Sequence, residues 1–452
     1  MKNTSEITSH PIPFLVLKYA IPNIVGMLSS ALYIVVDGIF IGNTVGSRGL
    51  ASINLVMPAF SFVAGLGLMA SVGGGTMVSI GMGRQDMDRA RQMFRMTLSL
   101  LAGISLLALL ASFAAGEPVA RFLGADASVL PGVLTYLRIL SVFLPAFLGS
   151  FFLDYMLRAT GHPRTAMVTM AGTSLLNILL DYLFIVVAGQ GIAGAALATG
   201  LAQSAGFGVM LFLFSRGKNS FSLRPGAVRL PLAARALYNG SSEFFSEISY
   251  GVSTLLFNRV LMRTAGISGV SAFAVVGYVN VMIAFVIIGL ATSLQPLISV
   301  NHGAGLEDRV RGILRWGYLY GLTFTGLVMA LLLTHRRELA ALFIPGEDAL
   351  LELTSRAMGI IFAGFAFMCI NIVSSSFFTA IEWAGTSMVI SVSRGIALIT
   401  AGLFLLPLVW GLDGIWMTQP AAELLTCLMA ILLIRRRMNR TPLASARESG
   451  RI

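Results

Sequence analysis

Residues 14–40 read FLVLKYAIPNIVGMLSSALYIVVDGIF, and the only charged side chains in this run are Lys18 and Asp37. A helix needs about 20 predominantly apolar residues to cross the hydrocarbon core of a bilayer. The run therefore predicts a transmembrane helix. A carboxylate at membrane depth costs about 2.5–3.5 kcal/mol on insertion scales and usually faces a cavity or a partner. Asp37 is therefore a candidate functional residue.

The whole chain has the composition of a polytopic membrane protein. Of its 452 residues, 56% are hydrophobic and 11% are charged, and the mean hydropathy is +0.84. The net charge of +11 lies in loops between apolar segments, which indicates membrane topology and contacts to anionic lipid rather than nucleic-acid binding. Cys369 and Cys427 fall in apolar segments and are expected to be free thiols. The predicted helices are 14–40, 51–80, 93–115, 132–157, 165–187, 192–215, 236–260, 270–299, 312–334, 352–380, 386–408 and 413–434.

Basic residues predict the orientation of the chain. Alternate loops carry arginine clusters and the intervening loops carry fewer, so the positive-inside rule places both termini in the cytoplasm. We expect a multi-pass membrane protein with this orientation. Its predicted parts are an N-lobe (1–215), a cytoplasmic linker (216–235), a C-lobe (236–440) and a cytoplasmic tail (441–452).

The two halves of the chain form an internal repeat. Residues 46–95 align with 266–315 at a shift of 220 positions without a gap, and 191–194 meets 411–414 at the same shift. Each half holds six predicted helices, an even number, so the halves run in the same direction. We therefore expect an all-α membrane protein of twelve transmembrane helices in two six-helix lobes, with substrate bound between the lobes.

Four polar residues of the first half fall at a similar depth. Counted from the basic residues at their cytoplasmic helix ends, Asp37, Asp181 and Thr199 lie roughly 26–28 Å along their helices, and Asn177 roughly 20 Å. Two carboxylates, an amide and a hydroxyl suit a cation, either Na⁺ held by oxygen ligands or a shared proton. The alternative is that these side chains are buried structural hydrogen-bond partners.

The second half has its own buried charges. Glu243 and Glu247 are four residues apart and share one face of their helix, and Arg394 and Glu423 have similar depths in the last two helices. One hypothesis is an ion pair between Arg394 and one of the glutamates. The other is a second site for a proton or a cationic substrate.

No catalytic site is visible in the sequence. There is no paired nucleophile and base and no metal-binding motif such as HExxH, so we expect a protein that is not an enzyme and that has no cofactor beyond a coupling ion. Asp154 and Arg158 are four residues apart near a cytoplasmic helix end and are expected to pair with each other.

The order and spacing of several motifs resemble those of the multidrug and toxic compound extrusion (MATE) family, in particular its MepA-like bacterial subgroup. These motifs are Leu32-Tyr33, Val36-Asp37 and Phe40-Ile41-Gly42 in the first helix, the glycine-rich segment 73–83, Gln295-Pro296, Asn301-His302-Gly303-Ala304, and Gly411-Leu412-Asp413-Gly414-Ile415-Trp416. The resemblance covers nearly the whole chain. It implies two six-helix lobes in a V shape, a place in the bacterial cytoplasmic (inner) membrane, and export of amphipathic, often cationic compounds, driven by inward Na⁺ or H⁺.

The resemblance also bears on the candidate sites. Related prokaryotic members hold the coupling cation in an N-lobe cluster of Asp, Asn, Asp and Thr, which Asp37, Asn177, Asp181 and Thr199 match one by one. Another branch uses acidic residues of helices seven and ten, but helix ten here offers only Asn371.

The predicted function is a cation-coupled multidrug efflux antiporter that works by alternating access, as a monomer surrounded by membrane lipids. Its partners are small amphipathic or cationic molecules, and no nucleic acid. The alternative is a lipid-linked oligosaccharide or lipid II flippase of the same general architecture, which requires a basic cavity for an anionic headgroup.

Overall fold

The computed structural model describes residues 2–216, 221–224, 226–344 and 347–439, so the predicted tail 441–452 lies outside the described residues. These parts are helical and contain no strand. The helices are α1 (Lys2–Ser9), α2 (Ile12–Thr44), α3 (Ser47–Gly83), α4 (Met87–Ala114), α5 (Gly116–Phe122), α6 (Leu130–Val142), α7 (Leu144–Ala159), α8 (Pro163–Asp181), η1 (Tyr182–Val187), α9 (Gly191–Arg216), α10 (Leu230–Asn239), α11 (Ser241–Gly303), α12 (Glu307–Thr334), α13 (Arg336–Ala341), α14 (Asp348–Ile361), η2 (Phe362–Gly364), α15 (Phe365–Ala380), α16 (Ala384–Val392), η3 (Ser393–Ala397) and α17 (Leu398–Asn439).

Twelve membrane crossings follow from these helices, as predicted. Two of the long helices contain a backbone break, at Gly266 in α11 and at Gly411 in α17. Helix α11 therefore supplies two crossings, and α17 supplies the end of one crossing and the whole of the next. One crossing is instead built from two helices, α6 and α7, which meet at a bend of 51°. Apolar side chains such as Leu107 and Leu408, which are 69% and 81% exposed, cover the outside, where lipid tails replace water.

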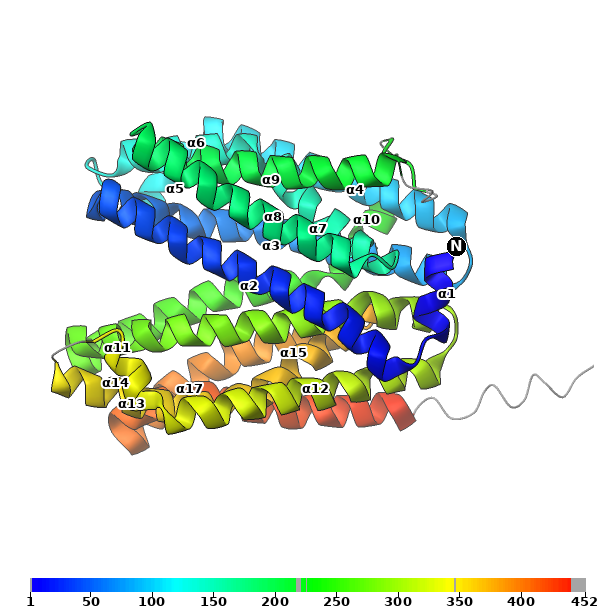
Figure 1. The fold of residues 1–452 in the computed structure, drawn as a ribbon. Helices are drawn as coiled ribbons and strands as arrows, with labels where there is room; N and C mark the ends of the chain where they lie inside the picture. Colours follow the sequence, from blue (N-terminus) through cyan, green and yellow to red (C-terminus); the bar gives the residue numbers. More distant parts are fainter. Residues whose placement is uncertain (1, 217–220, 225, 345–346, 440–452) are drawn as a thin grey trace, which may run out of the picture.

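The crossings form two lobes that approach each other at one end of the molecule and diverge at the other (Figure 1). Helices α3 to α9 make up one lobe, and α11 to α17 make up the other. Both α1 and the last turn of α17 lie at the end where the lobes meet, which we call the terminal side (Figure 1).

The backbone confirms the internal repeat. The left-handed residues Gly46 (φ 77°) and Gly191 (φ 54°) recur 220 positions later at Gly266 (φ 63°) and Gly411 (φ 53°). Glycine has no Cβ to clash in this region, so it can end one crossing and start the next within a single residue. The repeated glycines therefore mark the same chain reversals in both lobes.

Helix α2 is shared between the lobes. Its first turns, with Leu15, Val16 and Tyr19, are buried in the core of the C-terminal lobe, whereas Ile41 near its end is buried in a core of the N-terminal lobe. Figure 1 shows α2 running obliquely from one layer of helices to the other. A movement of one lobe relative to the other must therefore change the packing of α2.

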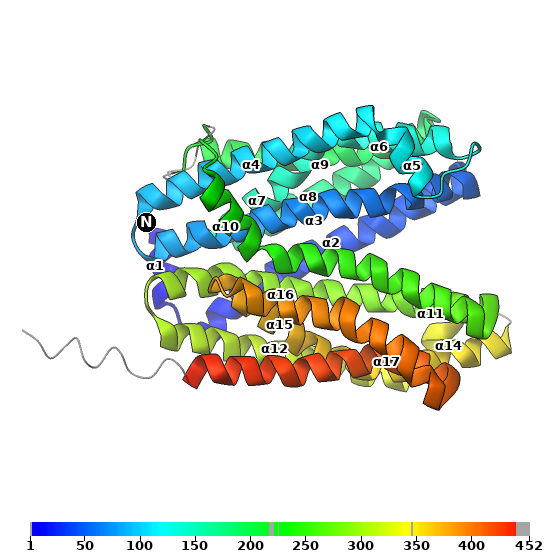
Figure 2. The same cartoon turned by 180° about the vertical axis from the view of Figure 1, so that it is seen from behind.

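A short helix, α10, connects the lobes on the terminal side (Figure 2). It crosses the predicted boundary at residue 236, and the crossing predicted for 236–260 begins only at Ser241. Gly240 separates α10 from α11, and a Cβ atom there would lie 1.9 Å from the carbonyl oxygen of Met69 in α3. The chain turns at Gly240 because only glycine allows this close approach of two backbones.

Candidate functional site

The four polar residues predicted in the first half come from three neighbouring helices of the N-terminal lobe. Asp37 lies on α2, Asn177 and Asp181 on α8, and Thr199 on α9. Asn177 and Asp181 are buried, with 2% and 0% exposure, whereas Asp37 and Thr199 are half-buried. The Asn177 side-chain amide donates a long hydrogen bond of 3.4 Å to the Thr199 hydroxyl.

The two carboxyl groups of this set lie close enough to interact electrostatically, although they are far apart in sequence. Both also interact electrostatically with the phenol groups of Tyr33 on α2 and Tyr136 on α6. Tyr136 is 3% exposed. We did not predict either tyrosine. Tyr33 had a sequence signal, since it precedes Asp37 by four residues and so shares its helix face, whereas nothing in the sequence connects Tyr136 to this site.

Several acceptor oxygens of the site have no donor among the described residues. These are one carboxylate oxygen of Asp37, the side-chain oxygen of Asn177 and both carboxylate oxygens of Asp181. Leaving a buried polar group unpaired costs about 1–3 kcal/mol, and more when the group is charged. The arrangement is therefore suited to a state in which a proton or a metal cation occupies it.

Asp181 lies where the helix changes its geometry. It is the last residue of α8, and the next turn, η1, is a π-helix. The matching crossing of the other lobe has the π-helical turn η3, which carries Arg394. Wide π-turns interrupt the regular hydrogen-bond ladder and are frequent at functional sites. Neither turn was predicted from the sequence.

The charged residues predicted in the second half separate into two groups. Arg394 and Glu423 form an ion pair with a shortest distance of 2.5 Å, in which both Nε and Nη2 of the arginine donate to the carboxylate. The Asn371 amide donates to the same carboxylate at 2.6 Å and to the Glu423 backbone oxygen at 2.8 Å. This part of the set is therefore the ion pair of the first hypothesis, with Glu423 as the partner.

Glu243 and Glu247 lie apart from this pair on α11. Gln295 donates a 3.0 Å hydrogen bond to Glu243, and the two glutamates interact electrostatically with each other. Among the described residues, neither forms an ion pair with Arg394. A Cβ atom built on Gly65 of α3 would lie 3.5 Å from the Cβ atom of Glu247. The two glutamates therefore occupy a helix that packs against the opposite lobe.

Asp154 and Arg158 of α7 form the predicted ion pair, at 2.6 Å. In the parts of the chain that the structure describes, no three His, Cys, Asp or Glu side chains are grouped for a metal ion. The N-lobe set has only two such side chains, and its remaining oxygens belong to an amide and a hydroxyl.

Two six-helix lobes, an internal repeat and carboxylates within the apolar crossings are typical of a multi-pass membrane transporter. The model of the MatE family matches residues 22–183 and 244–401. The chain belongs to this family, and it is a transporter rather than an enzyme.

Relatives and solved structures agree with this assignment. The multidrug export protein MepA of Staphylococcus aureus (strain NCTC 8325 / PS 47) is 24% identical over 432 residues, which cover 94% of each chain. MepA of Staphylococcus saprophyticus is also 24% identical, over 427 residues and 92% of each chain. A crystal structure of MATE in complex with MaL6 superposes with a TM-score of 0.91 at 19% identity, covering 97% of this chain and 99% of that one. An outward-facing structure of a multidrug resistance MATE family transporter gives 0.91 at 20% identity, covering 97% and 98%.

Proposed function

We propose that the protein is a cation-coupled antiporter that exports amphipathic, often cationic compounds by alternating access. The coupling proposal rests on one observation. Buried side-chain oxygens of Asp37, Asn177 and Asp181 accept no hydrogen bond from the described residues, and the helix that carries Asp37, α2, packs in the cores of both lobes. The multidrug export function of the MepA relatives supports the substrate class.

The proposed mechanism follows from these positions. A proton or Na⁺ that enters the Asp37–Asp181 site neutralises its charge and changes the packing of α2 against α8. Because α2 also packs in the core of the other lobe, this change alters the arrangement of the two lobes and lowers the affinity for the bound compound. The cation drives export only if it binds the drug-releasing state more tightly, since a ligand shifts an equilibrium by its differential affinity.

The second-half residues have separate roles in this proposal. Glu247 lies against Gly65 of the other lobe, and we assign it, together with Glu243 on the same helix face, to a second proton or cationic-substrate site. Arg394 and Glu423 are assigned to the scaffold, because each charge already has its partner. An anionic lipid-linked substrate, as in the flippase alternative, would need a basic cavity, and Arg394 is already neutralised by Glu423.

The proposed orientation places the terminal side in the cytoplasm of a bacterial cell, where the arginine-rich loops also lie. In this orientation, the side on which the lobes diverge faces outward. A cysteine introduced at the terminal side should react with a membrane-impermeant maleimide only after the cells are opened. Labelling in intact cells would show that the terminal side faces outward, opposite to the proposed orientation.

Efflux of ethidium from proteoliposomes, under separately imposed H⁺ and Na⁺ gradients, tests the proposal. Wild type should transport ethidium under one of the two gradients, and that gradient identifies the coupling ion. Asp37→Asn and Asp181→Asn should each abolish this transport. Asp308→Asn is the matched control, because the Asp308 side chain is 99% exposed. Unchanged transport by both site variants would refute the N-lobe coupling site, and absence of wild-type transport under both gradients would refute the antiporter.

A further inference from the structure

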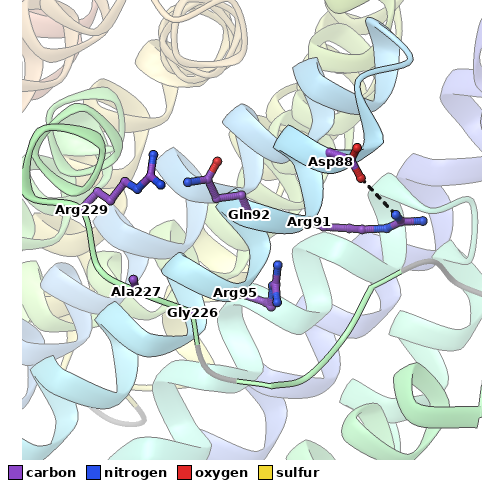
Figure 3. A pocket seen from close by; sticks show the side chains of 7 residues that line it. All are labelled: Asp88, Arg91, Gln92, Arg95, Gly226, Ala227 and Arg229. Atoms are coloured by element: carbon purple, nitrogen blue, oxygen red, sulfur yellow. Dashed lines mark hydrogen bonds and ion pairs between the residues drawn. The ribbon is translucent and has the colours of Figure 1, made fainter.

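A second polar site lies on the terminal side, outside the proposed transport path. It is a hollow of about 610 Å³ between the first turns of α4 and the segment that leads into α10. Figure 3 shows the side chains around it, with Gln92 and Arg95 on α4 and Arg229 on the opposite wall. The residues lining the hollow are Asp88, Arg91, Gln92, Arg95, Gly226, Ala227 and Arg229.

The charge of this hollow is strongly positive. Three arginines line it, against one carboxylate, Asp88, which pairs with Arg91 at 3.2 Å and whose side chain is 96% exposed. The Nε atom of Arg95 is buried and has no acceptor among the described residues. A buried guanidinium N–H without an acceptor favours an anion, and guanidinium groups match the oxygens of a phosphate group well.

The wall opposite α4 is held in place by backbone contacts. The Gly226 N–H donates a 3.0 Å hydrogen bond to the Ser99 hydroxyl of α4. A Cβ atom on Gly226 would lie 2.7 Å from the Cβ atom of Arg95. This segment therefore lies directly against α4, and the sequence places a glycine at the point of closest approach.

Apolar side chains adjoin the charged groups. Val228 and Leu230, on either side of Arg229, are 45% and 80% exposed. A free inorganic anion would gain nothing from contact with these apolar side chains. A phospholipid would, because it presents an anionic phosphate next to its acyl chains.

We propose that this hollow binds the headgroup of an anionic phospholipid from the leaflet on the terminal side. Arg95 and Arg229 contact the phosphate, and Val228 and Leu230 contact the upper part of the acyl chains. The bound lipid bridges the N-terminal lobe and the segment before α10, which connects the lobes. The inference depends on the membrane crossings and not on the transport reaction.

The internal repeat supplies a matched control. Arg315 of α12 is equivalent to Arg95 at the shift of 220, and it is exposed. The positions equivalent to 226–229 at this shift are 446–449, which lie outside the described residues. A general attraction of surface arginines to anionic lipid would involve both Arg95 and Arg315. A specific lipid site in the hollow would involve Arg95 alone.

Native mass spectrometry of the full-length purified protein, titrated with phosphatidylglycerol, phosphatidylcholine or inorganic phosphate, tests the proposal. Wild type should retain one phosphatidylglycerol, and Arg95→Ala with Arg229→Ala should weaken this binding roughly 25-fold, at about fivefold per arginine. Arg315→Ala should leave it unchanged. The unfolding temperature without lipid checks that the double variant is folded, and the single variant Arg229→Ala, at an exposed position, replaces it if it is not.

Three results would overturn the proposal. Equal phosphatidylglycerol binding by wild type and the arginine variants would mean that the hollow does not hold the headgroup. Phosphatidylcholine binding as tight as phosphatidylglycerol would remove the role of charge. Inorganic phosphate binding with the same affinity as phosphatidylglycerol would assign a site for free anions instead of a lipid site.

Discussion

Arg158 of α7 donates a 2.5 Å hydrogen bond to the side-chain oxygen of Asn23 in α2, across 135 positions of sequence. The amide nitrogen of the same Asn23 donates to the carbonyl of Gly289 at 2.5 Å and to the hydroxyl of Thr292 at 2.8 Å, both in α11. A single buried asparagine therefore connects a charged residue of the N-terminal lobe to the C-terminal lobe. In an alternating-access cycle this connection must break when the lobes separate on the terminal side.

Asn23→Ala should favour opening on the terminal side. The change leaves a buried guanidinium N–H without its acceptor, and hydrogen bonds to charged groups contribute about 1.5–3 kcal/mol. A loss of about 1.4 kcal/mol changes a two-state ratio tenfold. Double electron–electron resonance measures the effect with labels at residues 88 and 308, after Cys369 and Cys427 are replaced by serine, and a longer distance should gain population.

Ser29→Ala is the control for this experiment, because within the described parts of the chain the Ser29 hydroxyl bonds only the Val25 carbonyl of its own helix. It should leave the distance distribution unchanged. If Asn23→Ala also leaves it unchanged, the asparagine does not hold the lobes together.

Gly83→Ala should separate the same two lobes by steric contact. A Cβ atom at Gly83 would lie 2.1 Å from the Val300 carbonyl oxygen, and one at Gly303 would lie 2.3 Å from the Ile80 carbonyl oxygen, so α3 and α11 touch backbone to backbone. Overpacking of this kind costs about 1–3 kcal/mol. The same distance measurement should show opening with Gly83→Ala and with Gly303→Ala, but not with Gly103→Ala, where a Cβ atom meets nothing within 4 Å. Normal lobe distances in both variants would contradict the contact.

Glu423→Gln should destabilise the protein strongly, because it leaves the half-buried Arg394 without its carboxylate. Breaking a buried ion pair by changing one partner costs about 3–5 kcal/mol, whereas replacing both partners by apolar residues is often neutral. Thermal unfolding in detergent should therefore show a large loss for Glu423→Gln and recovery in the double variant Arg394→Met with Glu423→Leu. Ethidium efflux should survive in the double variant. If the double variant folds but does not transport ethidium, Arg394 and Glu423 take part in transport and are not only structural.

Gly266→Ala should destabilise the junction between the two crossings of α11. Gly266 has φ 63° and ψ −150°, a region that is nearly restricted to glycine, and a side chain held there costs about 1–3 kcal/mol. No atom lies within 4 Å of a Cβ at this position, so the cost is one of backbone conformation. Gly277→Ala, also in open space but inside the helix, should instead be neutral or stabilising by up to about 1 kcal/mol. Equal unfolding temperatures for the two variants would argue against strain at Gly266.

Much of the fold was predictable because it depends on local properties of the chain. The number of crossings follows from runs of apolar residues, and the repeat follows from glycines and arginines at a constant shift. The boundaries were less predictable. Hydropathy alone did not separate α10 from α11, since the break at Gly240 reflects its close contact with α3.

The candidate site was only partly predictable. Carboxylates are rare in apolar helices, so Asp37, Asp181, Glu243 and Glu423 could be selected without a structure. Their partners could not, since the choice of Glu423 for Arg394 depends on how η3 packs against α17. The proximity of Tyr136 to Asp37 and the π-turn after Asp181 likewise had no clear signal in sequence.

By itself the sequence determined that this protein crosses the membrane twelve times as two related halves, because burial in lipid selects apolar residues one segment at a time. Only the tertiary structure decided that α2 belongs to both lobes, that Asn23 joins Arg158 to Gly289, and that Arg95 faces Arg229 across a hollow. These relationships join residues more than a hundred positions apart. They depend on the packing of helices against one another, which hydropathy and periodicity along one helix do not encode.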